Sequence, residues 1–113
     1  MVSSTKVLVI LSSAEKEKAI AGLMYAKNAH ENRWVDDIRL VLFGPIERLL
    51  VTDAELRDLS STVFKIAAHP VACTTFADEP ATGNALKALG CEVDQVGAII
   101  SEYLRNGFIP LVF

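Results

Sequence analysis

The sequence predicts an α/β domain in which a five-stranded parallel sheet lies between helices, a three-layer α/β/α sandwich. Three observations favour this fold class. Short apolar runs alternate with helical stretches along the chain, as right-handed crossovers between parallel strands require. The first run, residues 6–11, is apolar on both faces, which is typical of an interior parallel strand. A length of 113 residues suits one core, so we expect a single domain over residues 1–113.

The expected strands are apolar or β-branched runs bounded by Gly, Pro or polar residues. They cover residues 6–11, 38–43, 71–73, 91–96 and 108–113. Pro70 is expected just before the third strand, and Gly44-Pro45 ends the second. Because Pro110 has no amide hydrogen to donate to a ladder, the last strand is expected at an edge of the sheet.

The expected helices begin at capping signals and end near glycines. Ser12 with Glu15, and Thr52 with Glu55, fit the capping box of a helix start. The first helix is expected to run to about residue 30, with an inner face formed by Ala19, Ile20, Leu23, Met24 and Lys27. A short helix is expected at residues 46–51, and another begins at residue 52 and loses its helical tendency over residues 60–63. Two short helical pieces are expected within 75–89, and a last helix at 98–106. Gly90 and Gly107 are expected to close the last two.

Composition excludes several classes of partner. The chain is 51% hydrophobic and 22% charged, which indicates apolar surface reserved for a subunit interface or a site. The net charge is −3 and no stretch collects Lys or Arg, so no nucleic-acid partner is expected. The longest apolar run, residues 7–11, is far too short to span a membrane. The first residues lack the features of a signal peptide, so we expect a cytoplasmic protein.

The cysteines and histidines do not form a metal site. Cys73 and Cys91 are separated by 18 positions, and a reducing cytoplasm disfavours a disulfide between them. His30 and His69 have no ligand spacing, so no metal is expected. The common nucleotide-binding and hydrolase motifs are also missing from the sequence, and no cofactor is expected.

The candidate site lies where the strands end, because ligands of open parallel sheets bind beyond the carboxyl ends of the strands. The residues expected to form its polar rim are Ser12, Ser13, Gly44, Thr74 and Thr75, together with Cys73. Cys73 would lie just before a helical segment, where amides and the helix dipole favour a reactive thiolate. The alternative is that Cys73 is a small hydrophobic core residue. Glu47 lies at a helix start, where capping explains it.

The order and spacing of these segments resemble a known family. The segments that carry the resemblance are Phe43-Gly-Pro45, Val71-Ala-Cys73, Leu86-Lys-Ala-Leu-Gly90, Asn106-Gly-Phe108 and Leu111-Val-Phe113. In this respect the chain resembles the DsrE/DsrF-like family of sulfur-relay proteins (the TusD and DsrE type), especially its small stand-alone members. The resemblance implies the strand order 4-3-2-1-5 and assembly as dimers, trimers or hexamers. It also implies a persulfide on the cysteine that matches Cys73, and offers no counterpart for Cys91.

The leading hypothesis is therefore a cytoplasmic sulfur-relay protein, a sulfurtransferase that carries sulfane sulfur on Cys73 and meets a donor or acceptor protein. In this hypothesis a functional Cys73 is partly exposed, and Cys91 is structural. The alternative is a non-catalytic oligomeric module of the same fold that binds a small ligand or acts as a scaffold. A flavodoxin-like cofactor binder is a third, weaker hypothesis, because the loop after the first strand offers little beyond its two serines to hold a phosphate.

Overall fold

The computed structural model describes residues 4–66, 68–75 and 80–113. Its strands form one parallel sheet in the order β4-β3-β2-β1-β5, as predicted. The strands are β1 (Lys6–Leu11), β2 (Asp37–Leu42), β3 (Ala68–Cys73), β4 (Glu92–Asp94) and β5 (Ile109–Val112). β5 lies at the edge beside β1, which confirms the place inferred from Pro110.

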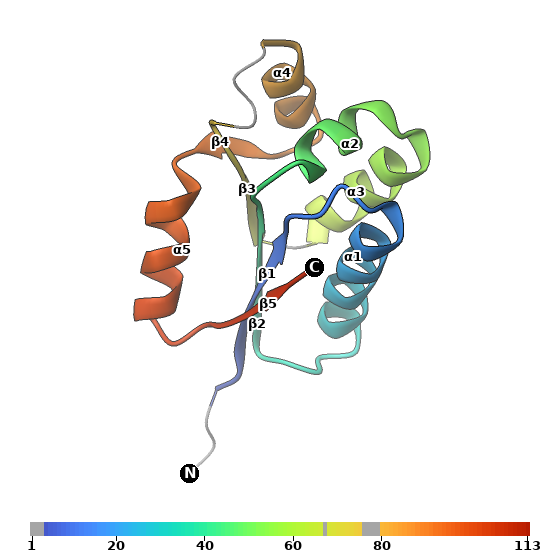
Figure 1. Cartoon of the computed structure of the whole chain (residues 1–113). Helices are drawn as coiled ribbons and strands as arrows, with labels where there is room; N and C mark the ends of the chain where they lie inside the picture. Colours follow the sequence, from blue (N-terminus) through green and yellow to red (C-terminus); the bar gives the residue numbers. More distant parts are fainter. Residues whose placement is uncertain (1–3, 67, 76–79) are drawn as a thin grey trace.

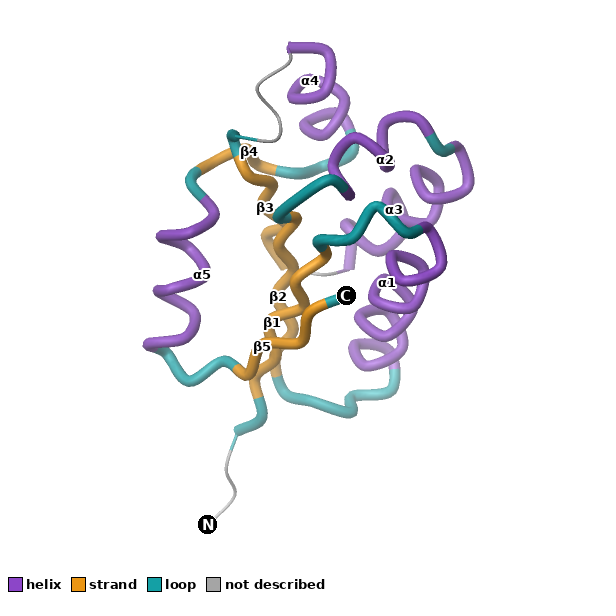
Figure 2. The backbone as a smooth tube through the Cα atoms, in the orientation of Figure 1, coloured by secondary structure: helices purple, strands orange, loops and turns teal. Residues whose placement is uncertain are grey.

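Helices cover both faces of the sheet, but unequally (Figures 1 and 2). They are α1 (Lys16–Glu31), α2 (Ile46–Thr52), α3 (Ala54–Ile66), α4 (Pro80–Ala88) and α5 (Val96–Arg105). Helices α1, α2 and α3 lie on one side of the sheet, and α4 packs against α2 on that same side. Of the helices in the described ranges, only α5 covers the opposite face, where it contacts β2 and β3. The three-layer sandwich is confirmed, with a second helical layer that is a single helix.

Two hydrophobic clusters hold the layers together. The larger one, between the sheet and α1–α4, includes Leu11, Leu23, Leu40, Leu56 and Leu86. The smaller one, under α5, consists of Leu8, Ile10, Val41, Val71, Cys73, Val96 and Phe108. β1 supplies alternate residues to both clusters, and for this reason its sequence is apolar throughout.

Two elements are longer than their sequence signals indicate. α3 continues through the stretch where its helical tendency weakens, because Val63 and Phe64 are buried against the sheet. β3 begins at Ala68, so Pro70 lies inside the strand instead of before it. The register of β2 against β3 shifts between Arg39 and Val41, opposite the proline that cannot donate to the ladder.

The helix starts differ from the expected capping boxes, because α1 begins at Lys16 and α3 at Ala54. The Glu15 amide donates to the Ser13 hydroxyl at 3.0 Å, and the Leu56 amide donates to the Asp53 carboxylate at 3.0 Å. The expected caps at Ser12 and Thr52 are therefore wrong. At α3 the capping residue is the neighbouring Asp53, whereas the N-cap residue of α1, Glu15, makes no side-chain capping hydrogen bond.

The remaining helix predictions have mixed outcomes. Met24 is exposed, because the inner face of α1 is built from small residues that let the helix lie close to the sheet; these are Ala19, Gly22, Ala26 and Ala29, with Leu23. One helix, α4, stands where two pieces were expected, and residues 76–79 of the first piece lie outside the described residues. Gly90 and Gly107 follow α4 and α5 with φ of +102° and +83°, as helix-closing glycines should.

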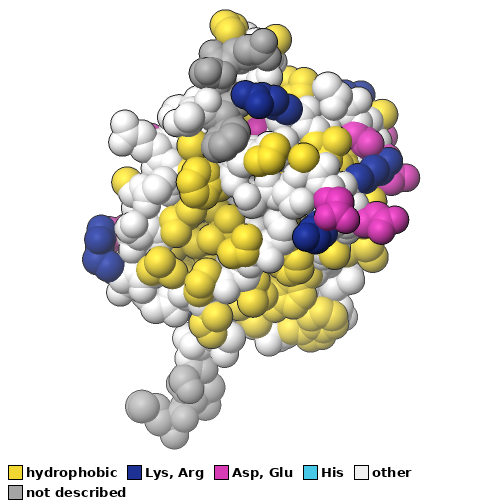
Figure 3. All heavy atoms as spheres, viewed as in Figure 1, with side chains coloured by type: hydrophobic (Ala, Val, Ile, Leu, Met, Phe, Trp, Pro, Cys, Tyr) yellow, Lys and Arg dark blue, Asp and Glu magenta, His cyan; other side chains and the backbone are white. Residues whose placement is uncertain are grey.

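A hydrophobic surface remains beside α5, where the second layer leaves the sheet uncovered (Figure 3). We call this surface on the α5 side of the sheet the open face, and Val112 of β5 belongs to it. Val112 pairs with Ile10 of the smaller cluster, so its side chain lies on the α5 side of the sheet, and it is 67% exposed. Phe43 and Leu104 are exposed as well. Among the described residues, none of the helices combines the length and apolarity needed to cross a bilayer.

Candidate functional site

The loops after β1 and β2 meet at the carboxyl edge of the sheet, as predicted. The Ile46 amide donates to the Ser12 carbonyl at 3.2 Å. Gly44 has φ of +138°, and a Cβ at this position would lie 2.7 Å from the Ser12 carbonyl oxygen. Glycine is therefore required by both the backbone conformation and the close approach. Ser12 and Gly44 form one tightly packed corner of the candidate site.

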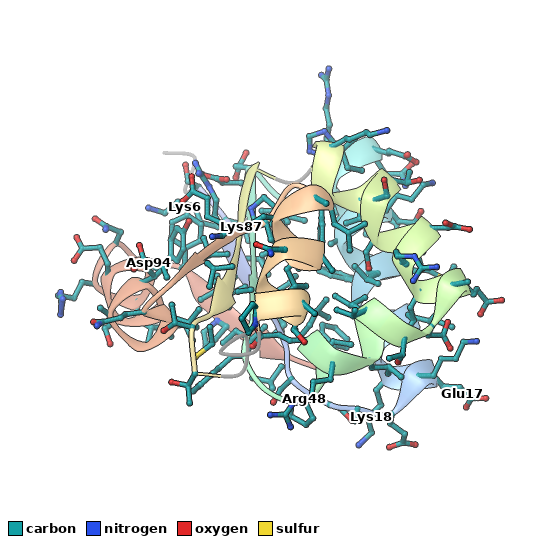
Figure 4. The ribbon with its side chains drawn as sticks, turned by 90° about the horizontal axis from the view of Figure 1, so that it is seen from above. Lys6, Glu17, Lys18, Arg48, Lys87 and Asp94 are labelled. Carbon is teal, nitrogen blue, oxygen red and sulfur yellow. The ribbon has the colours of Figure 1, made fainter. Side chains whose placement is uncertain are left out.

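The amides of this corner are already occupied. The carbonyl oxygen of Phe113 accepts hydrogen bonds from Ser12 and Ser13, at 2.8 and 3.3 Å. Beside them is a shallow cavity of about 440 Å3 lined by Ser12, Ser13, Lys18, Val112 and Phe113. Figure 4, which looks down on this edge, shows Lys18 of α1 and Arg48 of α2 at its rim. The corner thus offers a small ligand its serine hydroxyls and the Lys18 ammonium, which pairs with Glu15 at 3.5 Å on the surface, but not the two amides.

Cys73 ends β3, as predicted, but its thiol is not part of this corner. It is 6% exposed and belongs to the cluster under α5. The expected partial exposure is therefore wrong. The reason is the alternation along β3, which turns Ala72 toward α1–α4 and Cys73 toward α5.

The surroundings of Cys73 differ from the expected thiolate-stabilising turn. The Thr74 amide donates to the Asp94 carbonyl at 3.0 Å, which extends the ladder with β4. The described residues that follow Cys73 directly, Thr74 and Thr75, form a turn and not a helix. Thr74 and Thr75 are exposed on the β3 side of the edge. The structure therefore gathers Ser12, Ser13 and Gly44 in one place and leaves the two threonines beside β4.

A buried carboxylate, Glu47, was missed by the sequence analysis. It lies in the first turn of α2, as expected, but capping does not explain it, because the side chain is completely buried and neither carboxylate oxygen accepts a hydrogen bond of ordinary geometry. Burial raises the pKa of Glu47 to about 7, partly offset by the nearby backbone amides of Gly44 and Cys73. The available signal was its helical neighbourhood, since Ile46 and Leu50 on the same short helix are both core residues.

Cys91 lies on the Glu47 side of the sheet. It is buried in the larger cluster, and its amide donates to the Leu86 carbonyl at 3.0 Å. Burial, with a smaller effect from the charge of Glu47, raises the pKa of the Cys91 thiol to about 12. This thiol is protonated at neutral pH and unreactive as a nucleophile, which agrees with a structural role.

A second cavity, of about 490 Å3, lies near the amino end of the sheet under α5. It is lined by Lys6, Asp37, Arg39, Ile99, Glu102, Tyr103, Asn106 and Phe108. Arg39 is paired with Asp37 at 3.0 Å, so the charges of this cavity are largely balanced within the chain. Within the described ranges, His, Cys, Asp and Glu side chains form no group of three or more that could hold a metal ion.

Comparisons with known proteins support the fold and add no activity. No protein-family model matches the chain, and no curated protein matches it. Among solved structures, the chain is similar to the conserved protein of unknown function BT1422 from Bacteroides thetaiotaomicron. The TM-score is 0.84 at 24% identity, over 96% of this chain and 95% of that one. At this identity the likeness concerns the fold alone.

Proposed function

We propose that the protein is a cytoplasmic persulfide carrier of the DsrE-like type, with Cys73 as the sulfur-carrying residue. The observation that supports the proposal is the position of this cysteine. It ends β3, an interior strand of the parallel sheet, at the edge where α/β folds of this class place their ligands. The strand order that the family resemblance implied is also the order of this sheet.

The chemistry requires one thiolate and no external oxidant. The Cys73 thiolate attacks a terminal sulfur of a polysulfide donor; a sulfur–sulfur bond forms at Cys73 while one in the donor breaks. The shortened polysulfide leaves with the electron pair. A thiolate of an acceptor protein then attacks the outer sulfur of the Cys73 persulfide and releases the Cys73 thiolate. Because Cys73 is 6% exposed, both steps require the edge around β3 to open.

The first experiment tests sulfur loading directly. Purified protein is treated with polysulfide, and the mass of each cysteine-containing peptide is measured. We expect the mass of one sulfur atom to be added at Cys73 and removed by a reducing thiol. Cys73→Ser should not load, whereas Cys91→Ser, which removes the buried and protonated thiol, should load like the unmodified chain.

The Cys73→Ser variant also has to be shown to fold. A hydroxyl in the apolar cluster under α5 should cost about 1–3 kcal/mol of stability, which urea denaturation measures. Loading of Cys73 and Cys91 to the same extent, or no loading of the folded chain, would contradict the persulfide function.

A second candidate is a non-catalytic module that binds a small ligand at the corner. The favouring observation is the cavity lined by Ser12, Ser13 and Lys18, separate from the buried thiol. Hydroxyl groups beside an ammonium suit a small anion. Titration with sulfite or phosphate, followed by the amide signals of Ser12 and Ser13, tests this candidate. Shifts that saturate in the unmodified chain and are lost in Lys18→Ala would support it.

We also propose that the carrier is a homo-oligomer in which the open face is covered by a second copy. Exposed apolar side chains gathered beside an incomplete helical layer favour a protein interface. Pro110 removes an amide donor from the edge strand β5, so face-to-face contact is favoured over continuation of the sheet.

A further inference from the structure

Charged side chains lie on a face of the sheet that is otherwise apolar. On β1, Leu8 belongs to the cluster under α5, and the alternation of the strand places Lys6 on the same face. On β2, Val41 belongs to that cluster, so Asp37 and Arg39 also lie on the α5 face. All three charged residues are half-buried and line the cavity of about 490 Å3 at the amino end of the sheet, which we call the amino-end cavity.

The other side of the amino-end cavity is apolar and aromatic. It consists of Ile99, Tyr103 and Phe108, and the Tyr103 and Phe108 rings meet edge to face with their centroids 4.9 Å apart. α5 leaves this space because it is held to the sheet mainly at its first turn, where Val96 is buried, whereas Ile99 and Tyr103 are half-buried. The volume lies in the range of about 300–1,000 Å3 that small-molecule sites occupy.

Both carboxylates that line the cavity have partners within the chain. Asp37 accepts hydrogen bonds from Nε and one Nη of Arg39, at 3.0 and 3.3 Å. Glu102 pairs with Arg105 at 3.3 Å. The two negative charges are therefore offset. Because a guanidinium carries more N–H groups than Asp37 uses, Arg39 keeps donors for a ligand.

Lys6 is the lining cation whose charge is left over. Among the residues that the structure describes, it pairs with no carboxylate. Its ammonium donates to the Asn106 carbonyl at the end of α5 and lies 5.0 Å from the centroid of the Phe108 ring. These contacts hold the ammonium beside the apolar side of the cavity and use only part of its donors. A ligand with one negative charge would complete the balance.

We propose that the amino-end cavity binds a small organic carboxylate with a flat apolar body. Lys6 and Arg39 donate charge-assisted hydrogen bonds to the carboxylate. The two aromatic rings and Ile99 pack against the body. The site is separate from Cys73, which ends β3 at the opposite edge of the sheet, so this proposal does not depend on the persulfide function.

The test is an NMR titration of the unmodified chain with three probes at constant salt concentration. Phenylacetate has both parts of the proposed ligand, phenylacetamide lacks the charge, and acetate lacks the ring. The backbone amide signals of Lys6, Arg39 and Tyr103 report binding. We expect saturating shifts with phenylacetate, and dissociation constants about tenfold or more higher for the other two probes, because each lacks one set of contacts.

A lysine variant tests the charge. Lys6→Met keeps a long apolar side chain and removes the ammonium, so it should bind phenylacetate about tenfold or more weakly and phenylacetamide with little change. The matched control is Lys65→Met, at an exposed position in the last turn of α3 and outside the cavity, which should bind as the unmodified chain does.

Three results would overturn the proposal. They are the absence of saturating shifts with phenylacetate, equal affinity for phenylacetamide, and shifts confined to Ser12 and Ser13 at the corner. Because the comparison of probes uses the unmodified chain, it decides the proposal even if Lys6→Met, which loses the hydrogen bond to the Asn106 carbonyl, fails to fold.

Discussion

At the scale of the residue, the burial of Glu47 makes a prediction about stability. Its pKa rises from 4.5 to about 7 on folding, so the folded chain holds a proton that the unfolded chain releases. The contribution of this group to stability should therefore be greatest below about pH 4.5 and should fall as the pH rises to about 7, by on the order of 3 kcal/mol. Urea denaturation across this pH range measures the slope.

The matched comparison is Glu47→Gln against Glu17→Gln. The amide has nearly the same shape as the protonated acid and does not ionise. Glu47→Gln should therefore flatten the decline and be the more stable chain above pH 7. Glu17→Gln, on the surface of α1, should keep the decline of the unmodified chain. An equally steep decline in all three chains would show that another group is responsible.

Sequence reasoning located Cys73 along the chain but not in space. The apolar residues before Cys73 and the polar ones after it correctly marked the end of a strand. The face of the sheet on which the Cys73 thiol lies depends on the register of β3, which Pro70 alters. Its burial depends on α5, which covers it and follows about twenty-five positions later in the chain. The burial of Glu47 was missed for a similar reason: a glutamate near a helix start fits capping, and the packing of α2 against α3 and α4, which come later in the chain, is not visible locally.

At the scale of the element, the start of α3 allows a test of which residue caps it, Asp53 or Thr52. Asp53→Ala removes the carboxylate that accepts from the Leu56 amide and should cost about 1 kcal/mol of stability. Its pair with Lys16, at 3.1 Å on the surface, should add little. Thr52→Ala should cost much less, because the Thr52 hydroxyl donates back to the Arg48 carbonyl within α2. Thermal or urea denaturation that finds Thr52→Ala the costlier change would contradict this capping.

The loop between β2 and α2 gives a second element-scale prediction. Gly44→Ala forces a side chain into a positive φ and against the Ser12 carbonyl, 2.7 Å from the new Cβ. This should cost on the order of 2 kcal/mol or more and disturb the corner cavity. Gly97→Ala is the control: nothing lies within 4 Å of its Cβ, and alanine at that helical position should gain roughly 0.5 kcal/mol. If urea denaturation finds both variants less stable, or both more stable, than the unmodified chain, the prediction is wrong.

The helices and strands were predictable where the local sequence pattern alone shows which of their residues are buried. β1 and β2 are apolar runs ended by polar residues or Gly44, and their positions were predicted within one residue. The end of α3 was not predictable, because Val63 and Phe64 extend the helix through contacts with distant residues. The short β4 is defined mainly by its pairing with β3, which local sequence does not encode.

At the scale of the whole molecule, the family resemblance implied the strand order and Pro110 indicated the edge position of the last strand, and the uneven covering of the sheet follows from that order. Helix count along the chain does not reveal which face each helix covers; the right-handed crossovers decide it. Since β1, β2, β3 and β4 follow one another in the same direction across the sheet, the helices that connect them, α1 to α4, lie on one side. The step from β4 back across the sheet to β5 places α5 on the other side, and one helix cannot cover five strands.

The last prediction concerns this uncovered surface. Val112 is 67% exposed on the open face, and Val112→Asp places a charge there. If a second copy covers the face, the charge would be desolvated in the interface, and the oligomer should dissociate while each chain stays folded. Sedimentation velocity at micromolar concentration measures the change, and circular dichroism checks the fold.

The matched control is Thr62→Asp, on the exposed side of α3, which should leave the assembly unchanged. A chain that is already monomeric without substitution would contradict the oligomer. An oligomer that survives Val112→Asp would place the interface elsewhere, and the exposed Met24 and Trp34, near α1, would be the next surface to test. Because the smaller cluster under α5 contains Cys73, dissociation should also raise the alkylation rate of Cys73 if the partner helps to cover that cluster.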